Sequence, residues 1–441
     1  MAGSSRKGWI VTLAGVGLNL ALGILYAWSV FAKQLTEPIE KGGFGWTRTQ
    51  ATLPYTIAIA CFALMMVPAG RLQDKLGPRL IAVAGSVLTG VGLVLASFAT
   101  PTTSWPAVVG FGLLAGTGFG LGYAAATPAA VKWFPPQKKG LITGLVVAGF
   151  GVAPVYIAPL SKWLLGAYGV AFSFRVLGLA FLVSTFLLSQ LIVNPEKPLN
   201  VAAPGAAKVP GSTDASWRDM VRTADFWLLW FQYALGATAG LMIIGHLAKI
   251  VAVQSGNAIK AGFVFVALLA VFNASGRIVA GIVSDRIGRT VTLVSVFLLQ
   301  AMNMVFFVRF TSFTGFLTGS AVAGFSYGAL LSLFPATAAD RWGTKSLGLN
   351  YGILFTAWGV GGVVGPILAG RIADATGSYE LAYQISAGLL LFAALLAMFS
   401  YVNVSVDVPS KAITISLGKP KPGPEPAAVA GNGPGQVQAS G

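Results

Sequence analysis

The sequence of 441 residues contains little charge and almost no cysteine or histidine. Charged residues make up 10% of the chain, whereas a soluble domain carries about 25%. The chain therefore has too few charged residues to cover the water-facing surface of a soluble protein of its length. The single cysteine, Cys61, excludes a disulfide within the chain. Because there is also only one histidine, a metal site built from these ligands is not expected, and we expect no cofactor.

The groups that carry out enzyme chemistry are missing as well. All 13 carboxylates fall in loops or near the ends of apolar runs, and no carboxylate dyad, metal-ligand set or activated nucleophile is visible. The nucleotide-binding pattern Gly-x-x-x-x-Gly-Lys-Ser/Thr is not visible either. We therefore expect neither an enzyme nor a process driven by ATP.

What the chain does have is apolar length. It is 55% hydrophobic with a mean hydropathy of +0.77, in runs of about 20 residues that suit a bilayer core. In lipid such runs must be helical, because each backbone group then pairs within its own segment. The sequence predicts an all-α membrane protein with twelve spans, at residues 9–32, 51–72, 79–98, 105–132, 138–161, 170–193, 225–253, 259–283, 290–309, 313–341, 345–371 and 380–403.

The spans divide into two six-helix halves. The first half is expected at residues 1–193 and the second at 225–403, and the proline-containing stretch 194–224 reads as a cytoplasmic linker. The linker is expected to end in a short amphipathic helix near Trp217 at the membrane surface. The tail, 404–441, has little that could pack, and we expect it to be largely disordered.

Lysine and arginine set the expected orientation. Roughly twice as many of them fall on the side that holds both termini and the linker, which predicts that this side is cytoplasmic. The net charge of +16 reflects this bias, so we expect no nucleic-acid partner. We expect a monomer in a prokaryotic inner membrane, with the lipid bilayer as its surroundings.

Two charged, glycine-punctuated loops repeat one another 211 positions apart. Residues 70–79 and 281–289 share the pattern Gly-x-x-x-Asp-Lys/Arg-x-Gly, each between two apolar runs. A loop repeated once per half is typical of a transporter built from two related halves. Their carboxylates can accept hydrogen bonds from neighbouring helix N-termini and hold one conformation closed. The expected gating residues are Asp74, Arg79, Asp285 and Arg289.

A second repeat is rich in glycine. Residues 132–144 resemble 341–352, and the glycines of 149–154 correspond to those of 359–366. Any single glycine here reads as plain helix packing. As a set in the fifth and eleventh spans, they are typical of gating helices in alternating-access transporters.

Arg277 is the sharpest candidate for a binding residue. It lies inside the eighth span, where an isolated guanidinium is costly, and no carboxylate lies near it in the span. A cation without a protein counter-ion suggests that the cargo is the counter-ion, bound through two parallel hydrogen bonds. The alternative is that Arg277 reaches the cytoplasmic interface or pairs with Asp285. Asn273 is on the same helix face and could orient Arg277 or bind the cargo.

The single histidine, His246, lies near the outer end of the seventh span. Its ordinary titration range is close to neutral, so it could relay a proton. A packed, hydrogen-bonded histidine is an equal alternative.

Four aromatic residues with polar tips lie within spans and not at their ends. Interfacial anchoring therefore does not explain them, and each hydroxyl or indole N–H needs a partner. Core packing and contact with cargo are equal alternatives for each. These residues are Tyr26, Tyr123, Tyr327 and Trp358.

With these motifs, residues 9–403 resemble the major facilitator superfamily, and within it the group of oxalate/formate antiporters and bacterial monocarboxylate transporters. The stretches that carry the resemblance are Tyr26-Ala-Trp28, Gly120-Leu-Gly-Tyr123, Lys132-Trp-Phe-Pro135, Phe272-Asn273 with Arg277, Leu333-Phe-Pro335 and Asn350-Tyr-Gly352. The resemblance implies a cargo site in which Arg277 binds a carboxylate among aromatic side chains. The implied substrate-binding residues are Arg277, Asn273, Tyr26, Tyr123, Tyr327, Phe355 and Trp358.

The chain lacks one of the two cations that oxalate transporters of this group place at the cargo site. In oxalate transporters of this kind a lysine of the eleventh helix joins the arginine, and here Trp358 occupies that position, while Leu331 replaces a tyrosine. The animal monocarboxylate transporters use an Asp-Arg pair in the eighth helix, where this chain has Asn273. One cation fits a monoanion better than a dianion. Proton coupling must then run through His246 or through the cargo carboxylate itself.

The sequence thus predicts a secondary transporter that moves a small monocarboxylate, such as lactate or pyruvate, together with a proton. An oxalate/formate type of anion exchanger is the alternative within transport. A membrane carboxylate sensor is the alternative outside it, although the linker and tail offer little surface for output.

Overall fold

The computed structural model describes residues 2–196, 214–259 and 262–406. Apart from one isolated bridge between Thr100 and Thr103, the regular structure of this part is helical. The expected all-α fold is confirmed. The distal tail, for which we predicted disorder, lies outside the described residues, and so does most of the linker.

The first half consists of long helices joined by short turns. Its elements are α1 (Ala2–Leu22), η1 (Gly23–Ala27), α2 (Trp28–Thr36), η2 (Ile39–Lys41), α3 (Arg48–Leu76), α4 (Pro78–Ala96), α5 (Trp105–Ala107), the π-helical η3 (Val108–Ala115), α6 (Gly116–Val131), η4 (Pro136–Lys138) and α7 (Lys139–Ser189).

The short helix expected at the end of the linker is α8 (Trp217–Val221). The second half follows it, with α9 (Ala224–Ile244), α10 (Leu247–Gln254), α11 (Gly262–Ile287), α12 (Arg289–Phe307), α13 (Phe313–Trp342), α14 (Leu347–Thr376) and α15 (Glu380–Val406).

Eleven helices in the described residues are long and apolar enough to cross a membrane. The longest, α7, contains two spans, because Gly169 has φ 77° and ψ −179° and interrupts the helix. A left-handed φ of this kind is strained for any residue with a Cβ atom. Counting the two arms of α7 separately gives the twelve spans expected from the sequence.

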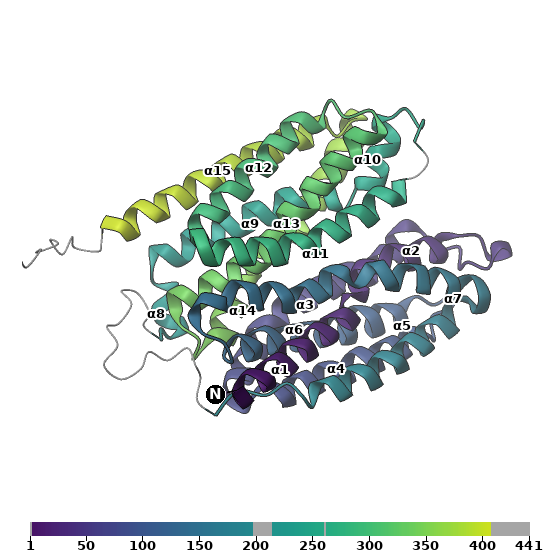
Figure 1. Cartoon of the computed structure of the whole chain (residues 1–441). Coiled ribbons are helices and arrows are strands. Elements are labelled where there is room, and N and C mark those ends of the chain that lie inside the picture. Colours follow the sequence, from purple (N-terminus) through teal and green to yellow (C-terminus); the bar gives the residue numbers. More distant parts are fainter. Residues whose placement is uncertain (1, 197–213, 260–261, 407–441) are drawn as a thin grey trace, which may run out of the picture.

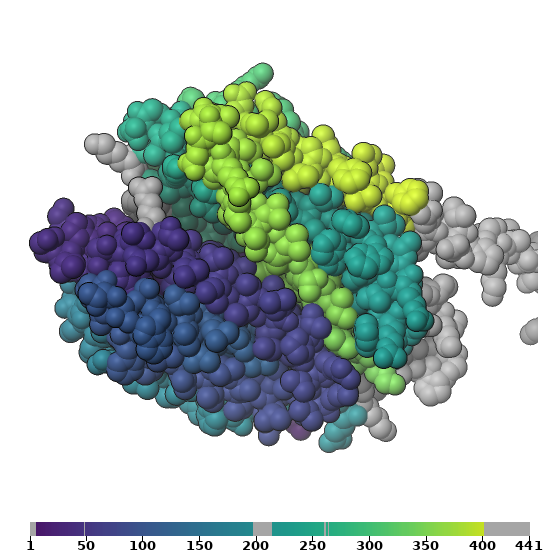
Figure 2. All heavy atoms as spheres, turned by 180° about the vertical axis from the view of Figure 1, so that it is seen from behind, coloured from purple at the N-terminus to yellow at the C-terminus, as the bar shows by residue number. Residues whose placement is uncertain are grey.

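The two halves lie side by side, with the N-terminus and α8 at one end and α2 and α10 at the other (Figure 1). We call the first of these the linker end. Two helix pairs join the halves along their length, α3 with α14 and α7 with α11. From behind, a recess separates the halves at the end opposite the linker end (Figure 2). The structure is therefore closed at the linker end.

Glycine makes the repeated loops possible. Gly77 and Gly288 have φ angles of 88° and 94° and separate α3 from α4 and α11 from α12. At the linker end the helices of the two halves touch through their backbones. A Cβ atom on Gly70 would lie 2.0 Å from the carbonyl oxygen of Gly348, so no larger residue fits there without separating α3 from α14.

Candidate functional site

Arg277 lies in the middle of α11 and is completely buried, with 0% of its surface exposed. Its Nε donates to Asn273 Oδ1 at 2.8 Å, and Nη1 donates to the backbone carbonyl of Val147 on α7. Its Nη2 is buried without a hydrogen-bond partner. One edge of the guanidinium is thus fixed by both halves, and one nitrogen is left over.

Within the described residues no carboxylate lies within ion-pair distance of Arg277. Asp285, the alternative partner, is bound instead to the start of α7 and to Arg289. Full burial also argues against a side chain that extends to the interface. Asn273 Oδ1 is bonded to the guanidinium, as expected if Asn273 orients Arg277; its role toward a cargo stays a prediction.

A small cavity of about 10 Å³ adjoins Arg277. It has room for about one water molecule. We call it the central cavity; its lining residues come from both halves and are Tyr26, Phe62, Tyr123, Phe150, Arg277, Leu331, Phe355 and Trp358.

The polar tips of the central aromatics bind one another. Trp358 Nε1 donates to the Tyr327 hydroxyl at 2.7 Å, and the Tyr26 and Tyr327 hydroxyls are 3.5 Å apart. Because Tyr26 belongs to the first half and Tyr327 to the second, this contact crosses between the halves. The predicted aromatic residues are therefore brought together around Arg277, with Phe355 stacked on Trp358 at 4.8 Å between ring centroids.

Three lining residues were not among the predicted binding residues: Leu331, noted from the sequence only as the replacement of a tyrosine, and two phenylalanines. Phe62 of α3 lies 5.6 Å from Trp358 and 5.4 Å from Tyr123 between ring centroids. Phe150 of α7 packs edge-on against Tyr26 at 5.0 Å. Phe150 does lie between the repeated glycines Gly149 and Gly151, which was the one available signal. Phe62 sits in a uniformly apolar run that gives none.

One contact between the halves at the linker end is centred on Asp74, and we call it the first gate after the role predicted for it. Its carboxylate accepts from the backbone N–H groups of Gly348 and Leu349 at 3.3 and 2.9 Å, at the start of α14. Lys132 Nζ is 3.8 Å from Asp74 Oδ1. Burial lowers the pKa of Lys132, and this effect exceeds the opposite effect of the nearby carboxylates of Asp74 and Asp214.

The second gate is centred on Asp285 and is more strongly charged. Its carboxylate accepts from Gly140 and Leu141 at the start of α7, both at 2.9 Å, and Arg289 Nη2 lies 2.7 Å from Asp285 Oδ1. Arg289 also binds Asp340 at 2.8 Å, and Lys139 of the first half binds the same carboxylate at 3.1 Å. The gate therefore includes an ion pair between the two halves.

The predicted gating residues thus separate into two groups. Asp74, Asp285 and Arg289 lie in contacts that close the linker end. Arg79 is exposed, and no ion pair involves it among the described residues. The reason is local: four residues after Asp285 comes Arg289, whereas four residues after Asp74 comes Pro78, which displaces Arg79 by one position.

His246 lies at the break between α9 and α10, away from the residues that line the central cavity. One ring nitrogen, Nε2, is 3.0 Å from the Pro366 carbonyl oxygen, so this nitrogen must carry a proton. The other, Nδ1, is 3.3 Å from the Tyr379 hydroxyl, which can donate to it. Both ring nitrogens therefore have partners within the second half, as a packed, hydrogen-bonded histidine would.

Comparison with known sequences decides the family. The chain matches the Major Facilitator Superfamily over residues 8–302 and 257–429. It belongs to this superfamily. It is accordingly a multi-pass membrane transporter and not an enzyme, with the twelve-helix fold expected from the sequence.

Among members of the superfamily, the chain is 29% identical over 400 residues to the oxalate:formate antiporter of Oxalobacter formigenes, covering 89% of this chain and 91% of that one. It is 26% identical over 388 residues to monocarboxylate transporter 13 of Bos taurus, covering 87% of each. The solved structure of the proton:xylose symporter XylE has the same fold, with a TM-score of 0.68 at 14% identity over 90% of this chain and 96% of that one. The relatives agree with the resemblance found from the motifs.

Proposed function

We propose that this member of the superfamily carries a small monocarboxylate, such as L-lactate or pyruvate, across the membrane by alternating access. The observation that carries the proposal is the free Nη2 of Arg277, buried beside a cavity and without a carboxylate partner. A buried cation left uncompensated is strongly destabilising. An anionic cargo would supply the missing charge and accept from the unused nitrogen.

The number of cations supports a monoanion. Among the residues that line the central cavity, Arg277 is the one that carries a charge. Trp358 contributes a neutral N–H that is bonded to Tyr327. Binding a dianion here would leave one negative charge buried among aromatic rings, which costs free energy.

We propose proton symport for this cargo. One proton carried with one monoanion moves no net charge across the membrane. Because both nitrogens of His246 are engaged away from the central cavity, we favour protonation of the cargo carboxylate over a relay through His246. We place the linker end in the cytoplasm of a prokaryotic cell, as the lysine and arginine distribution indicates.

An anion exchanger of the oxalate/formate type is the second candidate. The identity with the oxalate:formate antiporter over most of both chains favours it. In that case uptake would need an anion on the opposite side and would not respond to a pH gradient alone.

Uptake of labelled L-lactate into proteoliposomes distinguishes the two. We expect accumulation when the outside is acidic, and we expect unlabelled lactate to compete far better than oxalate. Uptake that ignores the pH gradient and requires formate or oxalate inside would replace symport with exchange. Empty liposomes and the Arg277→Gln protein are the matched controls.

A further inference from the structure

The central cavity has room for about one water molecule, which is too little for a three-carbon carboxylate, so cargo binding has to enlarge it. Tyr327 is in the position to move. Its hydroxyl accepts the Trp358 N–H on the side of the central cavity, and the residue also lines a second cavity within the second half. Tyr327 therefore stands between the two spaces.

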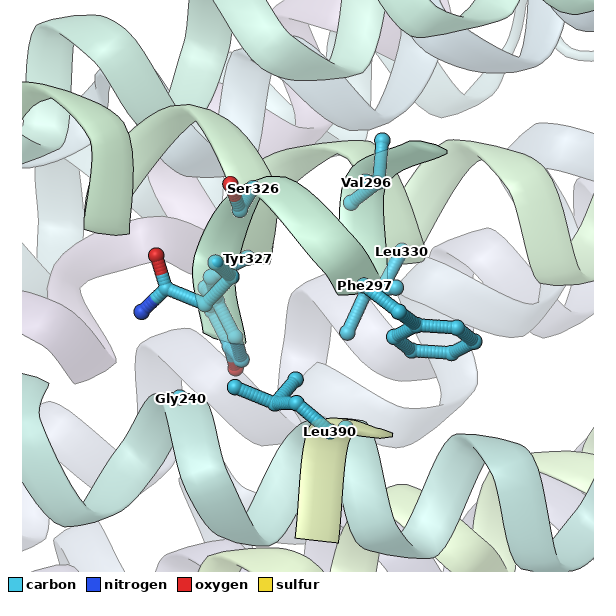
Figure 3. Close-up of a pocket in the computed structure, with 9 residues that line it drawn as sticks. Gly240, Val296, Phe297, Ser326, Tyr327, Leu330 and Leu390 are labelled. Atoms are coloured by element: carbon cyan, nitrogen blue, oxygen red, sulfur yellow. The ribbon is translucent and has the colours of Figure 1, made fainter. Parts of the chain in front are cut away.

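The second cavity, which we call the rear cavity, also measures about 10 Å³, the room needed for one water molecule or one hydroxyl group. Tyr327 and Ser326 of α13 line it together with Gly240 of α9 and Gln300 of α12. Figure 3 shows the Tyr327 side chain running toward Gly240. A Cβ atom on Gly240 would lie 2.7 Å from Tyr327 Cδ2, so the ring packs directly against the Gly240 backbone and any side chain at this position would hold the ring in place.

Two polar groups of the rear cavity have no partner. Gln300 is 3% exposed and Ser326 is 2% exposed, and neither Gln300 Nε2 nor Ser326 Oγ makes a hydrogen bond in the described structure. An unsatisfied buried donor is costly and calls for an explanation. The Gln300 amide is otherwise held in place, because its Oε1 accepts from Asn303.

We propose that cargo binding moves the Tyr327 hydroxyl from Trp358 into the rear cavity, where Gln300 Nε2 donates to it. The Trp358 N–H is then released and donates to the cargo carboxylate beside Arg277. Gln300 and Ser326 are thus positioning residues for the bound state. The inference rests on the proposed function, since it assigns the Trp358 N–H as the second hydrogen-bond donor, beside Arg277, to the cargo carboxylate.

The exchange of partners explains the unsatisfied groups. In the empty protein the Trp358 N–H donates to the Tyr327 hydroxyl, and Gln300 Nε2 has no hydrogen-bond partner. With cargo bound, the Tyr327 oxygen accepts from Gln300, and the indole N–H gains a charged acceptor, which makes a stronger hydrogen bond than a neutral one. The bound state therefore has fewer unsatisfied buried groups than the empty one.

The test uses full-length protein in detergent, with L-lactate binding measured by calorimetry and Tm measured with and without lactate. We expect Gln300→Met to bind lactate about tenfold more weakly, while Tm without lactate stays the same or rises because an unsatisfied amide has been removed. Ser326→Ala should change both quantities in the same directions, by less. Ser320→Ala is the control: its hydroxyl is equally buried and unpartnered but does not line the rear cavity, so its lactate Kd should equal that of the wild type.

A double-mutant cycle separates this role from a general packing effect. In a Tyr327→Phe background the hydroxyl is absent, so Gln300→Met should no longer change the lactate Kd. Equal weakening in both backgrounds, or an unchanged Kd for Gln300→Met in the wild-type background, overturns the proposal. A lower Tm for Ser326→Ala with unchanged Kd would show that a bound water fills the rear cavity instead. If the wild-type protein itself binds no lactate, the proposed function fails, and the cycle then has to be measured with the anion that does bind.

Discussion

The two helix pairs that join the halves have opposite chemistry. The pair α7–α11, which we call the charged seam, contains the second gate around Asp285 and, deeper in the membrane, Arg277 bonded to the Val147 carbonyl. The pair α3–α14, the aromatic seam, contains the first gate around Asp74 and then Phe62 against Trp358. The two halves thus place a cation on one side of the central cavity and neutral rings on the other.

The difference supports the proposed preference for a cargo with a single negative charge. On the charged seam a guanidinium is held by both halves, so its position depends on their contact. Beside the central cavity, the aromatic seam offers apolar surface and one indole N–H but no charge. Each prediction below either removes the charge difference between the seams or moves charge from one to the other.

Removing the cation should have the largest effect. Arg277→Gln should abolish lactate uptake, because truncating one partner of a buried charge pair costs about 3–5 kcal/mol. Arg277→Lys should be severely impaired, since an ammonium lacks the fixed fork with which the guanidinium binds Asn273 and the Val147 carbonyl while directing Nη2 to the cargo. Initial uptake rates in proteoliposomes measure both. Near-normal uptake by Arg277→Gln would mean that the charged seam is structural.

Adding a cation to the aromatic seam should change the preferred cargo. Trp358→Lys places an ammonium across the central cavity from Arg277, so oxalate should gain at least about tenfold over lactate in competition. The two cations should also repel each other when the site is empty and lower Tm in the absence of an anion. A double variant, Trp358→Lys with Arg277→Gln, controls for the lost indole. Unchanged selectivity in Trp358→Lys would show that charge count does not set the preference.

The two gates should differ in strength. Asp285→Asn loses a close Arg289 partner and weakens a network that crosses the halves, which we expect to destabilise the closed state by about 3 kcal/mol. Asp74→Asn loses only a longer contact, with Lys132 of the same half. We expect it to destabilise the closed state by about 1 kcal/mol, the loss of a negative charge at a helix N-terminus.

Spin labels in a Cys61→Ser background can measure this difference. Exposed positions Lys75 and Lys345 flank the first gate, and Lys138 and Arg286 flank the second. The population with the linker end open should rise more for Asp285→Asn than for Asp74→Asn. Equal shifts would remove the distinction between the gates.

The position of the sole histidine should matter least. His246→Ala should retain gradient-driven lactate accumulation within about a factor of three, since the ring holds Pro366 and Tyr379 and does not line the central cavity. Accumulation and lactate–lactate exchange are compared in the same vesicles. Loss of accumulation with exchange preserved would make His246 the proton carrier.

Much of this arrangement could be predicted from the sequence, because charge in an apolar chain is informative. Arg277 and Asn273 share a helix face by spacing, and Asp74 and Asp285 were placed at helix N-termini by their repeated loops. Phe62 and Gln300 were not found, since helices that are apolar on every side give no periodic signal for the face that points inward. Tertiary packing alone determines which phenylalanine or glutamine meets the site.

Lactate binding by purified Arg277→Gln protein, compared with the wild type, tests the central claim most directly. Calorimetry needs no gradient, and Tm reports folding in the same sample. We predict measurable binding to the wild type, none to Arg277→Gln, and an unchanged or higher Tm for the variant because a buried, unpaired charge has been removed. Binding of lactate to Arg277→Gln with the affinity of the wild type would contradict the account.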